Sequence, residues 1–255
     1  MATSDQDLIH RFERWSDFTS GIVRLLFPNS PPVRGRYLFR GQRDATWPLS
    51  PSFDRSFPDV PVQDRLTLEK NLLDEFKRQC ESDRALQSTI ADPIGLIALA
   101  QHHGLPTRLL DWSDSPYIAA FFAYQHALHA FGGTVDTLTG DPVAIWILDS
   151  NHFVWNERFG VQIVAPPAWD NARLFSQSGR FTLSRTPHRS LQEYVTSFGD
   201  PGRGALQLAL LPLTEAPEAL ANLDLMGINS ATMFPGLDGR SRAAITRIVL
   251  NTLAT

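Results

Sequence analysis

The spacing of apolar residues changes at Gly132-Gly133, and this change divides the sequence into two parts of different character. Before it, apolar residues recur every three or four positions, which predicts helices near residues 4–26, 64–86, 94–103 and 117–130. After it, short apolar runs predict strands at residues 143–148, 162–164, 181–183, 206–213 and 245–250. An earlier strand is expected near residues 37–42. Segregated helices and strands are typical of α+β chains, so we expect a helical N-terminal half packed on a mainly antiparallel sheet.

The composition is that of an ordinary globular protein. Hydrophobic residues make up 43% and charged residues 20% of the 255 positions, and no linker demands a division, so residues 1–255 are expected to form one domain. The net charge of -4 gives no basic footprint for nucleic acid. A single cysteine, Cys80, excludes an intramolecular disulfide and fits a reducing compartment. With no apolar run of about 18 residues and no secretory signal, we expect a soluble, cytoplasmic protein without membrane contacts.

An arginine follows the apolar residues of the expected strand near residue 37. Arg40 lies between Phe39 and Gly41, and Gln42 comes next. A guanidinium is a fixed fork of N–H donors that suits a carboxylate or a phosphate, and a neighbouring glycine lets a ligand approach the backbone. The alternative is a structural ion pair with an acid such as Asp111.

A second group of polar residues lies between two strongly apolar helical segments, at residues 101–113. It contains two histidines, an arginine and an aspartate, namely His102, His103, Arg108 and Asp111. Polar side chains that emerge from so apolar a flank must be paired or must line a cleft. Adjacent helical residues point in different directions, so the two histidines are not expected to face one site together. We expect Asp111 within ion-pair reach of Arg40 or Arg108, with all three converging, and no metal site, because no second ligand pair follows.

A third group, at residues 171–181, places Gln177 and Gly179 ahead of Phe181. By itself it predicts the entry to a strand with a glycine bulge. The sequence contains no nucleophile elbow, no phosphate-binding loop, no dinucleotide-binding glycine motif and no His-Glu-x-x-His zinc motif. The chemistry of the chain is therefore expected to lie in the three polar groups.

These groups resemble the FRG-domain family, which is named after a Phe/Tyr-Arg-Gly triad, here Phe39-Arg40-Gly41. The similarity also takes in residues 75–77, 100–113, 116–123, 177–182 and, more weakly, 227 and 234–239. It covers about residues 30–240, after an N-terminal helix expected at about residues 4–26, and residues 100–113 are its most specific part. The resemblance implies a bacterial or phage toxin or defence protein, with an immunity or antitoxin protein as partner.

A more distant resemblance is to the Arg-Ser-Glu class of ADP-ribosyltransferases, in which an arginine on the first strand of a split sheet grips the phosphates of NAD. Arg40 corresponds to that arginine, residues 111–113 to the middle element and residues 177–179 to the third. Gly179 stands where this class has its catalytic glutamate, and Gln177 cannot replace an acid as a base. The resemblance therefore implies the split sheet and NAD binding, and leaves the catalytic acid open.

The two resemblances together imply an NAD-using enzyme, either an ADP-ribosyltransferase or an NAD-degrading enzyme, with a protein or nucleic acid as acceptor. Its ligand-binding residues would be Arg40, Gly41, Gln42, Arg108, Trp112 and Phe181. Its catalytic residues would be His102, His103, Asp111 and Gln177. Two alternatives use the same residues. One is a nuclease or phosphodiesterase that relies on histidine and arginine, and the other is a non-catalytic module that senses a ligand or binds a protein.

Overall fold

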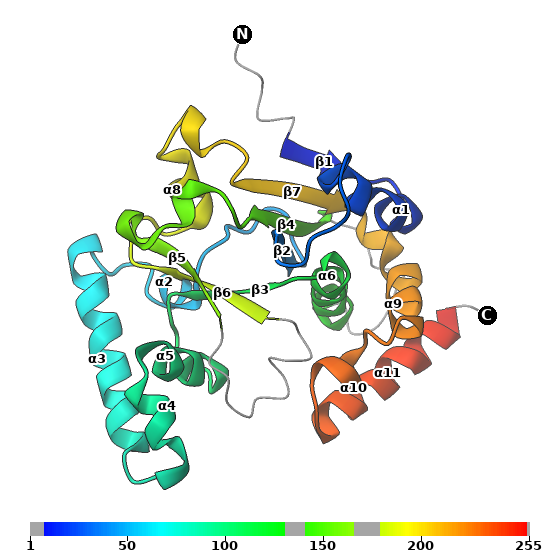
Figure 1. Cartoon of the computed structure of the whole chain (residues 1–255). Helices are drawn as coiled ribbons and strands as arrows, with labels where there is room; N and C mark the ends of the chain where they lie inside the picture. The colour runs from blue at the N-terminus through cyan, green and yellow to red at the C-terminus, as the bar shows by residue number, and fades with distance from the viewer. Residues whose placement is uncertain (1–7, 131–140, 166–178, 254–255) are drawn as a thin grey trace.

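A mixed sheet forms the centre of the molecule, and helices pack around it (Figure 1). The computed structural model describes residues 8–130, 141–165 and 179–253. Within these residues, seven strands lie in the order β1-β7-β4-β2-β3-β6-β5, and neighbouring pairs are antiparallel except β1 with β7. The strands are β1 (Ile9–Arg11), β2 (Tyr37–Gln42), β3 (Leu109–Ser113), β4 (Val143–Asp149), β5 (Val161–Val164), β6 (Gly179–Ser184) and β7 (Leu206–Leu211).

Helices form most of the connections between the strands. They are α1 (Trp15–Leu26), α2 (Ser52–Ser56), α3 (Val62–Cys80), α4 (Gln87–Ala91), α5 (Pro93–His102), α6 (Pro116–Ala130), α8 (Leu191–Thr196), α9 (Ala216–Leu225), α10 (Ser230–Met233) and α11 (Leu237–Leu253). Single turns of 3-10 helix are η2 (Arg84–Leu86), η3 (Phe153–Trp155), η4 (Glu157–Phe159), η5 (Asp200–Gly202) and η6 (Leu213–Glu215). The predicted α+β class and mainly antiparallel sheet are confirmed. In the described segments, each helix is too short or too polar to cross a lipid bilayer.

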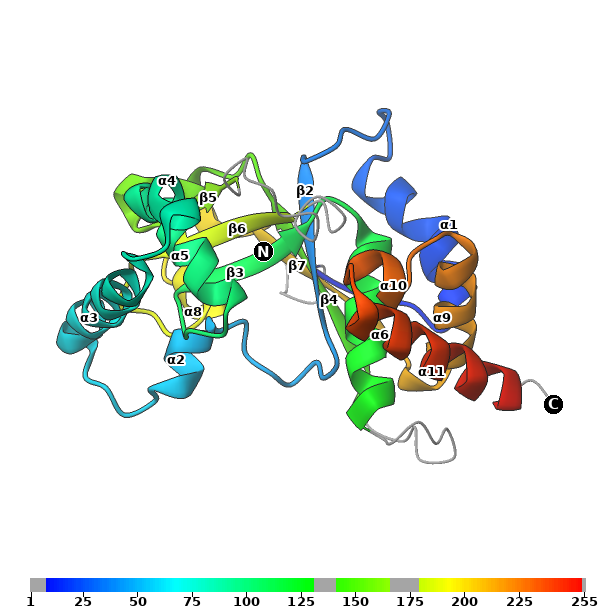
Figure 2. The ribbon, with the colours of Figure 1, turned by 90° about the horizontal axis from the view of Figure 1, so that it is seen from below.

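The alternation of side chains along the strands separates two cores. On one face, Phe39 and Ile147 lie opposite each other and pack with residues of α1, α6 and α9. On the other face, Leu38 and Leu148 pack with Trp112 of β3 and with residues of α8. Figure 2 shows α1, α6, α9 and α11 grouped together, away from α2, α3 and α5.

The first face of the sheet is covered by two different helices. Helix α6 packs on β2 and β4, whereas α5 packs on β3 and β6 through Ile97, Leu109 and Phe181. Figure 1 shows β3 running between α5 and α6. A cavity between these two helices is lined by residues of β2, β3, α5 and α6. This arrangement positions the site described below.

The predicted helix at residues 4–26 is wrong at its start. Ile9–Arg11 forms β1, which pairs in parallel with β7, and α1 begins only at Trp15. The backbone N–H of Arg14 donates to Asp17 Oδ2 at 3.1 Å, which caps the helix at that point. Pairing with a remote strand therefore overrides the helical spacing of the apolar residues.

The strand predicted at residues 245–250 is also wrong, because these residues lie in α11. Val249 and Leu250 contact the core cluster under α6 and α9, and Ala243, about two turns earlier, is buried, a spacing that fits one side of a helix. Ile245 and Ile248 are exposed, at 54% and 67%. Exposed isoleucines gave the segment the uniformly apolar appearance of a strand. With α9 and α10, this helix makes the C-terminal part more helical than predicted.

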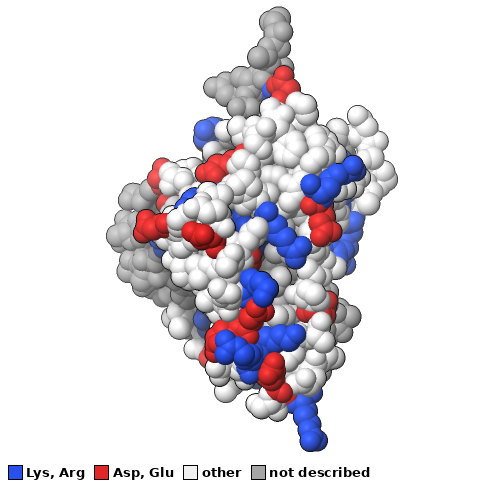
Figure 3. All heavy atoms as spheres, turned by 90° about the vertical axis from the view of Figure 1, so that its left-hand side faces the viewer, with Lys and Arg blue, Asp and Glu red and all other residues white. Residues whose placement is uncertain are grey.

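Helix α3 directs two charged residues inward. Leu66 is 48% exposed, whereas Arg65 and Glu69 are buried. The outer side of α3 carries ion pairs of its own, Lys70 with Asp74 and Arg78 with Glu75. Figure 3 shows the molecule from the side of α3 and α8, where positive and negative side chains lie next to one another.

Candidate functional site

A cavity of about 360 Å³ opens between α5 and α6, on the face of the sheet that these helices share. This volume lies in the range of small-molecule pockets. Its lining comes from β2, α5, β3, α6, β6 and the segment of α10 and α11, and consists of Phe39, Arg40, Gly41, Ala98, Gln101, His102, Asp111, Trp112, Ser113, Ala119, Phe122, His126, Phe181, Phe234 and Arg242.

Arg40 connects β2 to β3 at the floor of the pocket. Along these two fully described strands, the ladder pairs Phe39 with Ser113. Beyond that pair, Arg40 Nη1 donates to the backbone oxygen of Asp111 at 2.8 Å and lies 3.6 Å from Asp111 Oδ2. Burial lowers the pKa of the Arg40 guanidinium, and the Asp111 carboxylate opposes this effect. The predicted ion pair between Asp111 and one of the two arginines is confirmed.

The Asp111 carboxylate is held in place yet open to the pocket. Its side chain is 60% exposed, against 20% for Arg40. Asp111 Oδ1 accepts a hydrogen bond from Gln101 Nε2 at 2.8 Å, and Gln101 Oε1 accepts one from Thr107 Oγ1 at 2.5 Å. The relay of bonds runs from the loop before β3, through the last turn of α5, to the carboxylate. An exposed acid is thus fixed in orientation rather than free to rotate.

The two histidines at the end of α5 point in different directions, as adjacent positions on a helix require. Their rings meet edge to face, with centroids 5.0 Å apart. His102 lines the pocket, whereas His103 caps the helix and is exposed, outside the described lining. His102 is therefore the candidate for proton transfer, and the catalytic role predicted for His103 has no geometric support.

Gln42, expected to bind a ligand, lies in the core instead. It is 8% exposed and outside the described pocket lining. Its Oε1 accepts from Trp146 Nε1 at 2.6 Å, and its Nε2 donates to the backbone oxygen of Pro48 at 3.3 Å. Both polar atoms of the amide are therefore occupied by protein partners, and one of these, Trp146, belongs to the second core.

Of the predicted aromatic residues, Phe181 fits the site better than Trp112. The Trp112 indole is 3% exposed, packs in the second core and donates from Nε1 to Thr182 Oγ1 at 3.0 Å, so its faces are not open for stacking. Phe181 is equally buried but lies opposite Asp111 in the ladder, on the pocket face. It supports the floor rather than offering a free ring. Gln177, the remaining predicted residue, lies outside the described residues.

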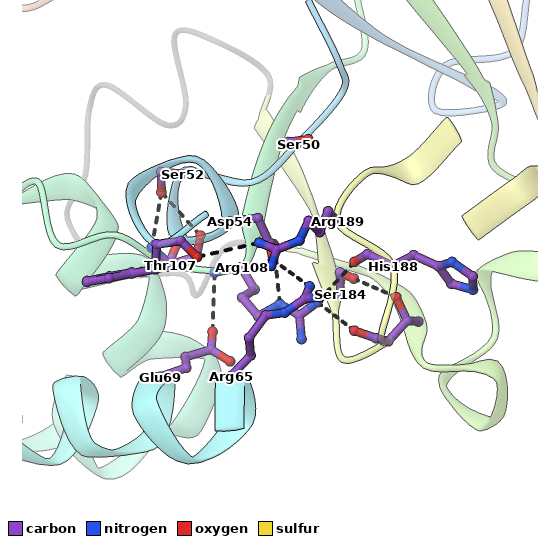
Figure 4. Close-up of polar contacts among 12 residues, drawn as sticks. Ser50, Ser52, Asp54, Arg65, Glu69, Thr107, Arg108, Ser184, His188 and Arg189 are labelled. Carbon is purple, nitrogen blue, oxygen red and sulfur yellow. Dashed lines mark hydrogen bonds and ion pairs between the residues drawn. The ribbon is translucent and has the colours of Figure 1, made fainter. Parts of the chain in front are cut away.

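Arg108 does not converge with Arg40 and Asp111, and it lies outside the described pocket lining. It is 1% exposed and lies 3.5 Å from Asp54 Oδ2, while Arg65 Nη1 donates to Asp54 Oδ1 at 3.0 Å. Arg108 Nη2 donates to the backbone oxygen of Thr186 at 2.7 Å. Figure 4 shows Arg108 surrounded by these residues and by Glu69, whose Oε1 accepts from its backbone N–H. Arg108 joins α2, α3 and the segment after β6.

Gly41 has a packing role that the sequence did not indicate. A Cβ atom there would lie 1.9 Å from the backbone oxygen of Ala119 and 2.9 Å from the backbone nitrogen of Ala123. Both are backbone atoms of α6, so the glycine lets this helix lie directly on β2. The glycine also lines the pocket. Its primary effect is to fix the distance between α6 and β2, the strand that carries Arg40.

The second wall of the pocket was not predicted as a site. It consists of Phe122 and His126 on α6, Phe234 after α10 and Arg242 on α11. Phe122 and Phe234 meet edge to face at 5.9 Å. Both phenylalanines belong to segments that carry the family resemblance, so the resemblance could have indicated them as site residues. His126 and Arg242 had no such signal, because they stand in ordinary helical sequence.

Comparison with known proteins gives a family for part of the chain. Residues 35–130 match the family model of the FRG domain, a range that holds Arg40, Asp111 and Phe122 and ends before Phe234. No curated protein and no solved structure matches the chain. Within the described residues, no group of three or more His, Cys, Asp or Glu side chains is arranged to hold a metal ion.

Proposed function

We propose that the pocket, part of whose lining comes from the residues 35–130 that match the FRG-domain model, binds NAD and breaks the bond between ribose and nicotinamide. One juxtaposition carries the proposal. The Arg40 guanidinium and the Asp111 carboxylate lie 3.6 Å apart and both line the pocket. A cation suited to a pyrophosphate thus stands next to an acid suited to a developing positive charge.

The chemistry requires little beyond positioning and charge. The bond between the anomeric carbon and the nicotinamide nitrogen breaks, and its electron pair leaves with nicotinamide. The sugar becomes an oxocarbenium-like cation, which the nearby Asp111 carboxylate stabilises. Water or an acceptor group then adds to the anomeric carbon and passes its proton to His102 or to solvent. Water would give NAD hydrolysis, and a protein or nucleic-acid acceptor would give ADP-ribosyl transfer.

The number of N–H donors that Arg40 keeps for a ligand supports a role in holding phosphate. A guanidinium carries five N–H groups, and the bond to the Asp111 carbonyl uses one of them. Arg40 Nε has no acceptor among the described residues. The side chain remains 20% exposed at the pocket, so a phosphate could take up further donors. The single ladder pair between β2 and β3 is also compatible with the split sheet of ADP-ribosyltransferases.

The biological setting follows as part of the same proposal. An enzyme that consumes NAD acts where NAD is abundant, in the cytoplasm, and the lone Cys80 is compatible with that compartment. Such an activity suits a bacterial or phage toxin or defence effector. It would call for an immunity or antitoxin protein that keeps the pocket closed in the producing cell.

Release of nicotinamide from NAD by the purified protein tests the proposal. Arg40→Lys keeps the charge but loses the fork, so nicotinamide release should fall at least about tenfold, equivalent to about 1.4 kcal/mol, while the melting temperature changes little. Asp111→Asn removes the negative charge and should reduce the rate by a similar or larger factor.

Matched controls are available outside the described pocket lining. Arg43→Lys changes an arginine that stacks on Trp47, outside the described pocket lining, and Asp59→Asn changes an exposed aspartate. Both should keep wild-type rates. A wild-type protein that neither releases nicotinamide nor gains thermal stability from millimolar NAD would disprove the proposal. A binding shift without turnover would favour the non-catalytic sensing module.

Phosphodiester cleavage is a second candidate, and one observation favours it. His102 and His126 line the same pocket as Arg40 and Arg242, so two imidazoles and two guanidinium groups share a cavity. One imidazole could act as base and the other as acid on a phosphodiester held by arginine. Cleavage of RNA or of a nucleotide diester that is lost in His126→Ala, together with stable NAD, would support this alternative.

A further inference from the structure

We infer that Phe122, Phe234 and Arg242 form the subsite for the adenosine half of the dinucleotide, so that its nicotinamide end lies at Asp111. This inference rests on the proposed function and adds the orientation of the substrate. It starts from the unequal character of the two pocket walls. One wall holds the acid, and the other holds two aromatic rings and a cation.

The aromatic wall is built to a definite geometry. The rings of Phe122 and Phe234 lie 5.9 Å apart with an angle of 86° between their planes. The guanidinium carbon of Arg242 lies 5.4 Å from the centre of the Phe234 ring. Both phenylalanines are only half-buried, so part of each ring faces the pocket. A flat base can stack on such rings or meet their edges.

The backbone fixes this wall without help from a ligand. A Cβ atom on Gly239 would lie 1.9 Å from the backbone oxygen of Phe234 and 2.6 Å from that of Ser230. The first turn of α11 therefore rests directly on the end of α10. Arg242 follows Gly239 by three residues, close to one helical turn, which sets it beside Phe234. The glycine belongs to the segment 234–239 that carried the weaker part of the family resemblance.

The two walls come from opposite sides of the cavity. In Figure 2, α5 and β3 lie on one side of the molecule, and α6, α10 and α11 lie together on the other. A ligand that touches both Asp111 and Phe234 must therefore span the pocket, as an elongated dinucleotide does. Arg40 stands on the Asp111 side, at β2, where it can reach the pyrophosphate between the two halves.

Charge decides which half of the dinucleotide goes to which wall. The nicotinamide ring of NAD is positively charged until the bond to ribose breaks, whereas adenine is neutral and its phosphate is anionic. A cationic ring beside Arg242 would be repelled, and the same ring beside Asp111 would be attracted. Adenine and its phosphate meet no such penalty at the phenylalanines and Arg242. The opposite orientation places the cationic nicotinamide ring beside the Arg242 guanidinium and leaves the neutral adenine at the Asp111 carboxylate.

The test compares NAD with nicotinamide mononucleotide, which lacks the adenosine half. Phe234→Ala and Arg242→Ala should each raise the KM for NAD by about tenfold, the size expected from losing one stacking or phosphate contact. Neither should change kcat/KM for nicotinamide mononucleotide. Affinity for AMP, measured by calorimetry, should fall by a similar factor in both variants. Arg240→Ala, an exposed arginine on the same helix, is the matched control.

Each outcome decides one of the two claims. Equal losses on both substrates would place nicotinamide at this wall and overturn the inference, as would unchanged AMP affinity in both variants. If the wild type releases no nicotinamide but AMP binding depends on Phe234 and Arg242, the proposed activity fails and the adenosine subsite stands. Because Arg242 is exposed, its replacement separates lost binding from lost folding, and Phe234→Leu provides a second variant that keeps apolar bulk.

Discussion

The buried charges around Arg108 are balanced, two acids against two arginines. Asp54 contacts both Arg65 and Arg108, whereas Glu69 bonds the backbone N–H of Arg108. Taking charges out of water is unfavourable unless each is paired. Burial raises the pKa of Glu69, and the attraction of Arg108 only partly offsets this. Asp54 is thus the acid on which the pairing depends, and Glu69 is the acid whose charge the fold tolerates poorly.

Replacement of these two acids should have opposite effects. Asp54→Asn leaves two buried arginines without their shared partner and should lower the free energy of unfolding by about 3–5 kcal/mol. Glu69→Gln keeps the acceptor for the Arg108 N–H and removes a charge that the fold disfavours, so stability at neutral pH should be unchanged or higher. Urea unfolding of both variants measures this. A loss in Glu69→Gln as large as that in Asp54→Asn would contradict it.

The pH dependence gives a sharper form of the same prediction. The pKa of Glu69 is higher in the folded chain than the value of about 4.3 in an unfolded one, so the folded state holds this proton more tightly. Its stabilising contribution is complete below that unfolded value and is lost as pH rises through the folded pKa. Stability of Glu69→Gln relative to wild type should therefore increase with pH across this interval.

Single residues also show how far the site was predictable. The pairing of Arg40 with Asp111 followed from local chemistry, because a charged arginine beside apolar residues needs an acid, and this acid came from an equally apolar flank. The same logic could not tell Arg108 from Arg40. Which arginine takes which acid depends on Asp54, at a position where the sequence shows only a proline-rich connection. The burial of Gln42 and Trp112 could not be predicted, because the residues next to a position in a strand do not show which face of the sheet its side chain points to.

At the scale of elements, the contact of α6 with β2 governs the shape of the pocket. It brings the backbone of Ala119 and Ala123 against Gly41, and it sets Phe122 and His126 over the strand that carries Arg40. Backbone atoms cannot rotate aside as a side chain can. Any side chain at residue 41 must therefore push the helix off the strand.

Gly41→Ala should consequently destabilise the protein by about 1–3 kcal/mol or more, by forcing α6 away from β2. Ligand binding should weaken as well, since the two pocket walls would no longer face each other at the same distance. Gly21→Ala, a change inside α1, is the control, because the nearest atom to a Cβ at this position is Phe12 Cε1, at 3.4 Å. That change should be neutral or stabilising by up to about 1 kcal/mol. Thermal melts in which both variants match the wild type would refute the close contact.

The elements that the sequence predicted well are predominantly apolar. In the segments at α5, α6 and β4, type and bounds follow from length and from the flanking glycine and proline. The errors, β1 and α11, lie at the two ends of the chain. There the outcome depends on a distant partner, β7 for the one and α9 and α10 for the other, which no local pattern specifies.

At the scale of the molecule, the family match and the fold have different extents. The match ends at residue 130, after α6. Within residues 35–130, β2 and β3 pair through Phe39 and Ser113, whereas every residue of β2 pairs with β4, and every residue of β3 pairs with β6. Both partner strands lie beyond the matched range. The matched segment thus contains Arg40 and Asp111 but not the strands β4 and β6 that complete the sheet around them.

A fragment of residues 35–130 should therefore fail to fold alone, whereas residues 8–253 should unfold in one cooperative transition. Without β4 and β6, the two strands keep one ladder pair, and α5 and α6 have no sheet on which to bury their apolar residues. Circular dichroism on heating and the dispersion of amide resonances would distinguish the two cases, with the longer chain as the reference. A fragment that melts cooperatively and shows a dispersed spectrum would mean that α2 to α6 hold the strands in place without the rest of the sheet. The Arg40 and Asp111 pair would then form without β4 and β6, and Phe234 and Arg242 would be additions to a site already complete.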